Sequence, residues 1–238
     1  MIYKRIILKI SGESLCGDKN NCIDINSALN IAKKIKELSD LNIELGIIVG
    51  GGNIIRGVNA CKHGFERATA DYMGMLSTVI NAMALQNSLE SLKVPTRVLT
   101  AIDINKVAEP YIRRRAIRHL EKKRVVILAG GTGNPFVSTD TAAALRALEL
   151  NAEVIFKATK VDGVYDADPM KDKTAKKFER LSYHEVLKRK LNIMDLSAIS
   201  MCMEKQLPIV IFNLWQDGLL KRAVMGENVG TIISDDEP

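Results

Sequence analysis

The chain has 238 residues, of which 47% are hydrophobic and 26% charged, a composition typical of a globular protein that can bury a sizeable core. Aromatic residues make up only 5%, which leaves few stacking platforms and argues against a protein that binds single-stranded nucleic acid. The formal net charge of +6 favours an anionic partner. Because lysine and arginine are spread along the chain, small phosphorylated ligands fit this charge as well as nucleic acid does.

Short β-rich runs alternate with helical patterns along the whole chain. In chain order we predict strands at 3–10, 43–50, 95–101, 124–130, 152–159, 207–213 and 230–234, with helices at 26–40, 66–92, 109–123 and 138–150. Such alternation requires a mostly parallel central sheet covered on both faces by helices, which is a three-layer α/β/α sandwich. No linker, internal repeat or low-complexity stretch divides the chain, so we predict one folded unit, at most in two lobes.

The cysteines and the apolar stretches exclude several classes of protein. Cys16, Cys22, Cys61 and Cys202 form no CxxC pair and have no histidine at zinc-ligand spacing, so they indicate neither a disulfide framework nor a zinc site. The first apolar run is broken by a lysine too early for a signal peptide. The longest uncharged stretch, 72–89, is too polar for a membrane span. We therefore expect a soluble cytoplasmic protein.

Four loops that follow predicted strands are rich in Gly, Thr, Asn or Asp. They are KISGES (9–14), VGGGNIIRG (49–57), AGGTGNPFVSTD (129–140) and ATKVDGVYDADP (158–169). In parallel sheets ligands bind beyond the carboxyl ends of the strands, which is where these loops lie. The third loop exposes backbone N–H groups and then opens a helix, an arrangement that attracts an anion, with a phosphate as the first candidate.

Familiar single-loop nucleotide motifs fail in these segments. A dinucleotide fingerprint would need glycine at Ile55 or at Phe136, and a Walker A loop would need lysine at Asp18. Several glycine loops must therefore share the phosphates. A hydrolase triad also lacks support, because no GxSxG occurs and none of the three histidines lies in a glycine loop.

Four charged residues in or near these loops each allow two interpretations. Lys9 ends an apolar strand, where it either meets an anion or extends its ammonium group to solvent. Arg56 closes the triple-glycine loop, within reach of a phosphate. Asp140 is either a helix cap or a group at the ligand. Asp71 is either a first-turn aspartate or an acceptor of hydrogen bonds from a sugar or base.

Phosphoryl transfer explains why no base is present in the loops. A phosphate acceptor, with a second pKa of about 6, is already ionised near neutral pH. The reaction then needs positive charge, N–H donors and Mg²⁺ around the transferring group. The basic segment 111–124 is either a solvated helix face or a surface for a regulatory nucleotide or a subunit contact.

Six stretches, in order and over nearly the whole chain, resemble the bacterial uridylate kinases of the amino acid kinase superfamily. They are LKISGE, GGGNIIRG, ADYMGMLSTVINAMAL, GGTGNPFVSTDTAA, ATKVDGVYDADP and MDLSA. The resemblance implies one amino-acid-kinase-type domain over 1–238 and reversible, Mg²⁺-dependent transfer of the ATP γ-phosphate to UMP in pyrimidine nucleotide biosynthesis. It also implies a homohexamer that GTP activates and UTP inhibits.

The resemblance also assigns site residues. Those implied at ATP are Lys9, Ile10, Ser11, Gly12, Gly52, Arg56, Thr159, Tyr165 and Asp168. Those implied at UMP are Gly51, Asp71, Thr132, Gly133, Asn134, Pro135, Phe136, Val137, Ser138 and Thr139. Lys9, Arg56, Asp140 and Asp195 are the implied catalytic residues, with no direct protein ligand to the metal. The segment implied to respond to GTP comprises Gly17, Asp18, Lys19, Asn20, Asn21 and Cys22.

Three alternatives remain open. A related kinase could act on a carboxylate or carbamate acceptor, such as acetylglutamate or carbamate. The same fold could serve as a nucleotide- or oxyanion-storage protein without catalysis. A basic regulator that binds nucleic acid is possible as a second role, and steep salt dependence would be its sign.

Overall fold

The computed structural model describes residues 2–17, 22–167, 169, 171–172, 174–191 and 193–235. Its strands are β1 (Arg5–Ile10), β2 (Glu44–Val49), β3 (Thr96–Thr100), β4 (Glu109–Pro110), β5 (Val125–Ala129), β6 (Val154–Thr159), β7 (Val164–Tyr165), β8 (Lys177–Phe178), β9 (Arg180–Leu181), β10 (Ile209–Asn213) and β11 (Thr231–Ile233). Its helices are the 3₁₀ helix η1 (Gly12–Leu15), then α1 (Ile25–Ser39), α2 (Gly57–Lys62), α3 (Arg67–Ser91), α4 (Arg113–Glu121), α5 (Thr139–Glu149), α6 (Tyr183–Lys188), α7 (Leu196–Glu204) and α8 (Leu219–Val224).

Among the described residues, nine strands form one sheet in the order β4-β3-β5-β2-β1-β6-β10-β11-β9. Neighbouring strands are parallel except β10 and β11, which pair antiparallel. Strands β7 and β8 form a separate antiparallel pair. The structure confirms the predicted α/β class with a mostly parallel central sheet.

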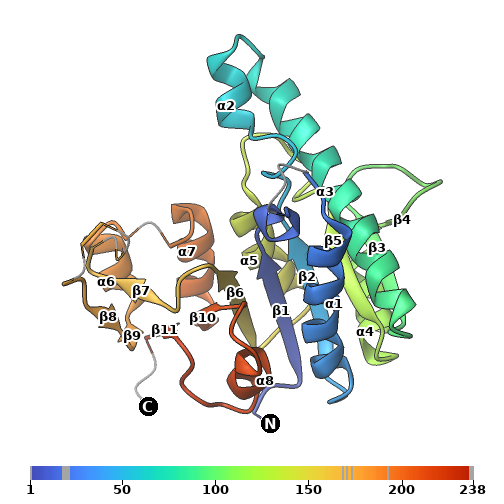
Figure 1. Ribbon diagram of the computed structural model, residues 1–238. Coiled ribbons are helices and arrows are strands. Elements are labelled where there is room, and N and C mark those ends of the chain that lie inside the picture. The colour runs from blue at the N-terminus through green and yellow to red at the C-terminus, as the bar shows by residue number, and fades with distance from the viewer. Residues whose placement is uncertain are drawn as a thin grey trace.

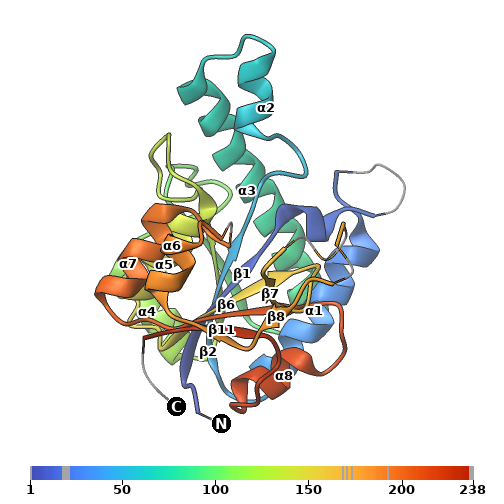
Figure 2. The same cartoon turned by 90° about the vertical axis from the view of Figure 1, so that its left-hand side faces the viewer.

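Two hydrophobic cores lie on the two faces of the sheet. Successive residues of a strand point to opposite faces, so Ile6 and Leu8 of β1 join the core under α1, α3 and α8. Ile7 joins the other core, which α4, α5, α6 and α7 cover. Figure 2 shows these two groups of helices on opposite sides of the sheet. Strand β5 is apolar throughout and β2 is apolar after Glu44, because both faces of these central strands are buried.

One predicted helix begins later than its pattern indicates. Helix α4 starts at Arg113 instead of residue 109, because Glu109 and Pro110 extend the sheet as β4. A proline disfavours helical backbone in the residue before it. Helices η1, α2, α6, α7 and α8 are additions to the predicted set. Among them α2, α6 and α8 are only six residues long, too short to show a clear helical period.

The strands β1, β2 and β5 end toward the part of the molecule from which α2 and the start of α3 project (Figure 1). Strand β1 starts at the opposite side. Among the described residues, no helix combines the length and the hydropathy that crossing a bilayer requires. The glycine loops thus occupy one end of the sheet, and the site is built there.

Candidate active site

Two lysines stand side by side at the carboxyl end of the sheet. Strands β1 and β6 are parallel neighbours, and their register pairs Lys9 with Lys157. Each lysine lies two positions beyond an isoleucine of the core under α5, so both side chains point to that face. Their side chains are 11% and 13% exposed. Two cations so placed require an anion between them.

Asp140, in the first turn of α5, supplies that anion. Lys9 Nζ lies 2.5 Å from Asp140 Oδ1, and Lys157 Nζ donates a hydrogen bond to Oδ2 over 2.7 Å. Lys9 and Asp140 Oδ1 form an ion pair. Lys157 also donates to the backbone carbonyl of Ile193. Lys9, Asp140 and Lys157 form what we call the charge clamp.

The charge clamp is electrostatically biased toward positive charge. Burial by itself would raise the pKa of Asp140, but the two lysine charges outweigh burial and hold that pKa below its ordinary value. Burial lowers the pKa of Lys157 and the Lys9 charge adds to this effect, whereas the carboxylates of Asp140 and Asp195 oppose it. Two ammonium groups share one carboxylate, so the clamp can accept a further anion.

Lys157 is a site residue that the sequence analysis missed. It interrupts the apolar strand β6 in the same way that Lys9 interrupts β1. A lysine within an apolar strand could therefore have been noticed in the sequence, but only the parallel register of the two strands shows that the lysines are neighbours.

The helix cap of α5 is Ser138, whose hydroxyl accepts hydrogen bonds from the amides of Asp140 and Thr141. The cap interpretation of Asp140 was therefore wrong. Asp195 begins α7, where its Oδ1 accepts from the amide of Ala198 at 2.8 Å and from Thr141 Oγ1 at 2.7 Å. Its Oδ2 accepts from the Ser138 hydroxyl. Asp195 thus joins the start of α7 to the start of α5.

A pocket of about 310 Å³ lies beside the charge clamp, and its lining includes Thr139, the residue before Asp140. Its lining comprises Gly51, Gly52, Ile55, Arg56, Gly57, Ala70, Asp71, Gly74, Met75, Thr78, Gly131, Thr132, Val137, Ser138 and Thr139. We call it the acceptor pocket, because it brings together six of the residues expected at UMP. Gly52 and Arg56, expected at ATP, line the same pocket, whereas the other four residues expected at UMP, Gly133, Asn134, Pro135 and Phe136, lie outside this lining.

Asp71 connects the long helix α3 to the loop after β5. Its Oδ2 accepts the backbone N–H of Phe136 at 2.8 Å, and Arg67 Nε donates to both carboxylate oxygens. The Arg67 guanidinium also lies over the Phe136 ring, 5.7 Å from its centre. Phe136 has a positive φ of 66° and is 68% exposed at the tip of the loop. A second hollow of about 470 Å³ adjoins these residues.

The loops after β1 and β2 pack so closely that a side chain does not fit between them. A Cβ atom on Gly12 would lie 2.6 Å from the Gly50 carbonyl oxygen. A Cβ on Gly51 would lie 2.6 Å from the Gly74 carbonyl oxygen of α3. Arg56 and Glu13 form an ion pair between the same two loops.

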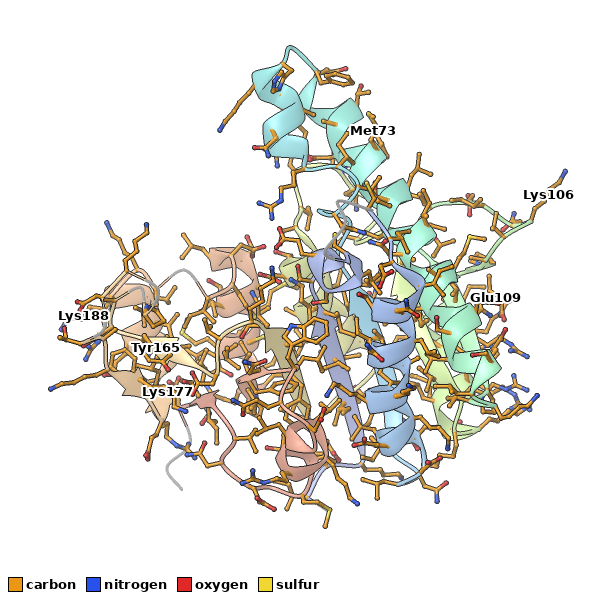
Figure 3. All side chains as sticks on the ribbon, in the orientation of Figure 1. Met73, Lys106, Glu109, Tyr165, Lys177 and Lys188 are labelled. Carbon is orange, nitrogen blue, oxygen red and sulfur yellow. The ribbon has the colours of Figure 1, made fainter. Side chains whose placement is uncertain are left out.

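Other residues expected at ATP lie at the end of β6, in the β7–β8 pair, and where β1 leads into η1. Thr159 ends β6, and its hydroxyl donates to the Val161 carbonyl at 2.6 Å. Tyr165 pairs with Lys177 in the β7–β8 hairpin (Figure 3), and its hydroxyl donates to Asp162 at 2.5 Å. Ile10 is buried in β1, and Ser11 caps η1. Asp168 lies outside the described residues.

The segment expected to respond to GTP is described only at its ends. Asp18, Lys19, Asn20 and Asn21 lie outside the described residues. The Cys22 carbonyl accepts a hydrogen bond from Asn53 Nδ2 at 2.6 Å. Asn53 is paired with the buried Asn81, which donates to the Gly50 carbonyl at 2.7 Å. These contacts connect Cys22 to the glycine loop after β2.

Comparison with known proteins gives consistent matches over the full fold. The sequence model described as the amino acid kinase family matches residues 4–213. The structure superposes on UMP kinase from Bacillus anthracis with a TM-score of 0.95 and 41% identity, covering 99% of this chain and 97% of that one. UMP kinase from Ureaplasma parvum gives a TM-score of 0.92 and 35% identity, with 99% and 100% coverage. Uridylate kinase from Archaeoglobus fulgidus gives 0.74 and 29%, with 96% and 99% coverage.

Replacing Asp140 tests the charge clamp. We expect Asp140→Asn to lower the free energy of unfolding at pH 7 by about 3–5 kcal/mol, because two buried ammonium groups lose their shared counterion. The pKa of Asp140 is depressed in the folded state, so its contribution is complete above the unfolded value of 3.8 and is lost as pH falls through the folded pKa. Urea denaturation at several pH values measures this difference.

Asp217→Asn is the matched control, because Asp217 pairs with Lys34 but its side chain is 97% exposed. We expect little change in stability for this variant. An Asp140→Asn protein no less stable than the Asp217→Asn protein would contradict the clamp.

Proposed function

The chain belongs to the amino acid kinase family, and on that premise we propose that it is a UMP kinase, which transfers the γ-phosphate of ATP reversibly to UMP. Its close structural likeness to two bacterial UMP kinases supports this activity. The reaction yields UDP and ADP, and it would serve pyrimidine nucleotide biosynthesis by supplying UDP and CTP.

One observation carries the proposal: the charge clamp adjoins a pocket of suitable chemistry for a nucleoside monophosphate. Thr139 lines the acceptor pocket and is followed directly by Asp140, the carboxylate that holds both lysines. The pocket also contains Arg56, a guanidinium that can bind phosphate with two hydrogen bonds. Asp71, another residue of the lining, offers a carboxylate to a sugar or base.

In the proposed reaction the acceptor phosphate attacks the γ-phosphate in line. Lys9 stabilises the charge that develops on the transferring group, and Asp140 holds Lys9 in place. We infer the same role for Lys157, which shares that carboxylate. Because the acceptor phosphate is already ionised near neutral pH, the site needs no general base.

The remaining site residues divide between the acceptor phosphate and ATP. Arg56, the N–H groups at the start of α5 and Thr139 would bind the acceptor phosphate, since they line the acceptor pocket. The loop after β1, with Ser11 and Gly12, would lie against the ATP phosphates. Thr159, Tyr165 and Asp168 would lie near the adenine and ribose. Asp195 would act through Ser138 and Thr141, which it holds.

Phosphoryl transfer from ATP generally requires a divalent metal, and we propose Mg²⁺. Among the described residues, no three or more His, Cys, Asp or Glu side chains gather into a metal site. Mg²⁺ commonly keeps several waters and binds one or two carboxylates together with substrate phosphates. The residues therefore suit a metal ion that is carried by the phosphates of ATP, with the Asp140 carboxylate beside those phosphates. The ion would neutralise phosphate charge.

We further propose that copies of the chain form a homohexamer in the cytoplasm and that residues 1–238 make up one domain. The exposed face of α3 supports self-association, because Tyr72, Leu76, Ile80 and Met83 repeat along it at helical spacing and are 42–49% exposed. Activation by GTP and inhibition by UTP are proposed on the resemblance of the sequence.

The choice of acceptor is tested by ADP release with ATP, Mg²⁺ and a panel of UMP, CMP, dTMP, acetylglutamate and carbamate. We expect turnover with UMP that exceeds turnover with CMP and dTMP by about tenfold or more, since hydrogen-bonding pockets discriminate strongly between polar groups. Turnover with a carboxylate or carbamate, or the absence of turnover with every acceptor of the panel, would overturn the proposed function without affecting the fold assignment.

Lys9→Met tests the role of the clamp in catalysis. We expect kcat to fall by about 10²- to 10³-fold, because a donor to the transition-state charge is lost. The fold should persist, since Lys157 still neutralises Asp140. Circular dichroism checks the fold, and Lys36→Met, on the exposed surface of α1, is the matched control. A Lys9→Met enzyme with kcat like that of Lys36→Met would remove Lys9 from the mechanism.

A further inference from the structure

Arg146 is a buried cation in α5, remote in sequence from the loops that form the site. It is only 6% exposed. A buried arginine is expensive to desolvate unless its guanidinium is fully engaged, so its partners indicate what it holds. The charge clamp does not include it, and the sequence resemblance assigns it no role.

Its partners are Glu149 and Tyr111. Arg146 Nη1 lies 2.6 Å from Glu149 Oε2, and the guanidinium carbon lies 3.8 Å from the centre of the Tyr111 ring. The Tyr111 hydroxyl donates to the same Glu149 oxygen at 2.6 Å. Burial, with the Glu149 carboxylate, raises the pKa of Tyr111, so the hydroxyl keeps its proton and its hydrogen bond. The three side chains therefore hold one another rigidly.

The free edge of the guanidinium faces the acceptor pocket. Arg146 Nη2 lies 3.5 Å from the backbone carbonyl oxygen of Gly131, a residue of the pocket lining. Gly131 has a φ of +58°, and a Cβ atom placed on it would touch nothing within 4 Å. This glycine is therefore free of steric constraint, and other conformations of the turn are open to it.

The turn 130–133 has other anchors, but they hold its ends. The Gly130 amide donates to Thr78 Oγ1 at 2.8 Å, and the Gly133 amide donates to the Gly130 carbonyl at 2.9 Å. Gly133 also packs against Ala101. The Gly131 carbonyl, between these points, is the group that the guanidinium reaches.

We propose that Arg146 is a positioning residue for the acceptor: supported by Tyr111 and Glu149, it orients the Gly131 carbonyl and so fixes the pocket-lining turn 130–133 in the form that binds UMP. The proposal deepens the proposed function and depends on it for the identity of the ligand. Arg146 lies outside the pocket lining, and its effect would be selective for the acceptor, because most of the residues expected at ATP lie on other loops.

Arg146→Lys tests this proposal. Lysine keeps the charge but lacks the planar fork that stacks on Tyr111 while reaching Glu149 and Gly131. We expect the KM for UMP to rise about tenfold, with the KM for ATP within about twofold of wild type, because a misplaced turn weakens acceptor binding alone. Hydrogen exchange of amides 131–133 should accelerate, while exchange in the sheet core stays unchanged.

The matched control is Arg222→Lys, because Arg222 forms an ion pair with Glu227 on the exposed surface. Tyr111→Phe is a second variant, which keeps the ring under the guanidinium but deletes the hydroxyl bond to Glu149. It should shift the KM for UMP in the same direction by a smaller factor, and it carries the test where Arg146→Lys fails to fold.

Equal changes in both KM values, or no change in either, would overturn the positioning role. Failure of the proposed function is distinguishable, because wild-type enzyme would then show no turnover with UMP. The exchange rates of amides 131–133 would still report whether Arg146 holds the turn, and unchanged rates in a folded Arg146→Lys protein would overturn the proposal.

Discussion

The Asp140 carboxylate, shared by lysines on two adjacent parallel strands, is the interaction on which the rest of the site depends. The register of β1 and β6 places like charges beside each other at the carboxyl end of the sheet. Such a pair is tolerated only because the first turn of α5 brings an anion between them. The two largely buried ammonium groups can then stabilise the charge of a transferring phosphate.

Helix α5 connects this charge to the acceptor pocket. Its first turn carries Asp140 and lines the acceptor pocket with Thr139, whereas Arg146, two turns later, reaches the Gly131 carbonyl on the wall of the same pocket. One rigid element therefore sets both the reacting end and a part of the acceptor wall, and close glycine contacts such as that of Gly51 with α3 bring the other wall near.

Much of this could be predicted from the sequence. Alternating apolar runs and helical periods gave the parallel sheet, and the glycine loops marked its functional end. Lys157 and Arg146 could not be identified in the same way, because their roles arise from strand register and from contacts between distant segments. The sequence left Asp140 as either the cap of α5 or a group at the ligand, since Ser138 and Asp140 are both favourable near a helix start and only backbone geometry identifies Ser138 as the cap.

The claim that charge alone, without a general base, drives the transfer is tested most directly by the pH dependence of kcat/KM for UMP. The account predicts a single rise near pH 6, about the second pKa of the acceptor phosphate, followed by a level rate through the neutral range. An acceptor analogue whose phosphate ionises at lower pH should move the rise by the same interval. A rise that stays at one pH with both acceptors would assign the ionisation to a base of the enzyme and contradict the account.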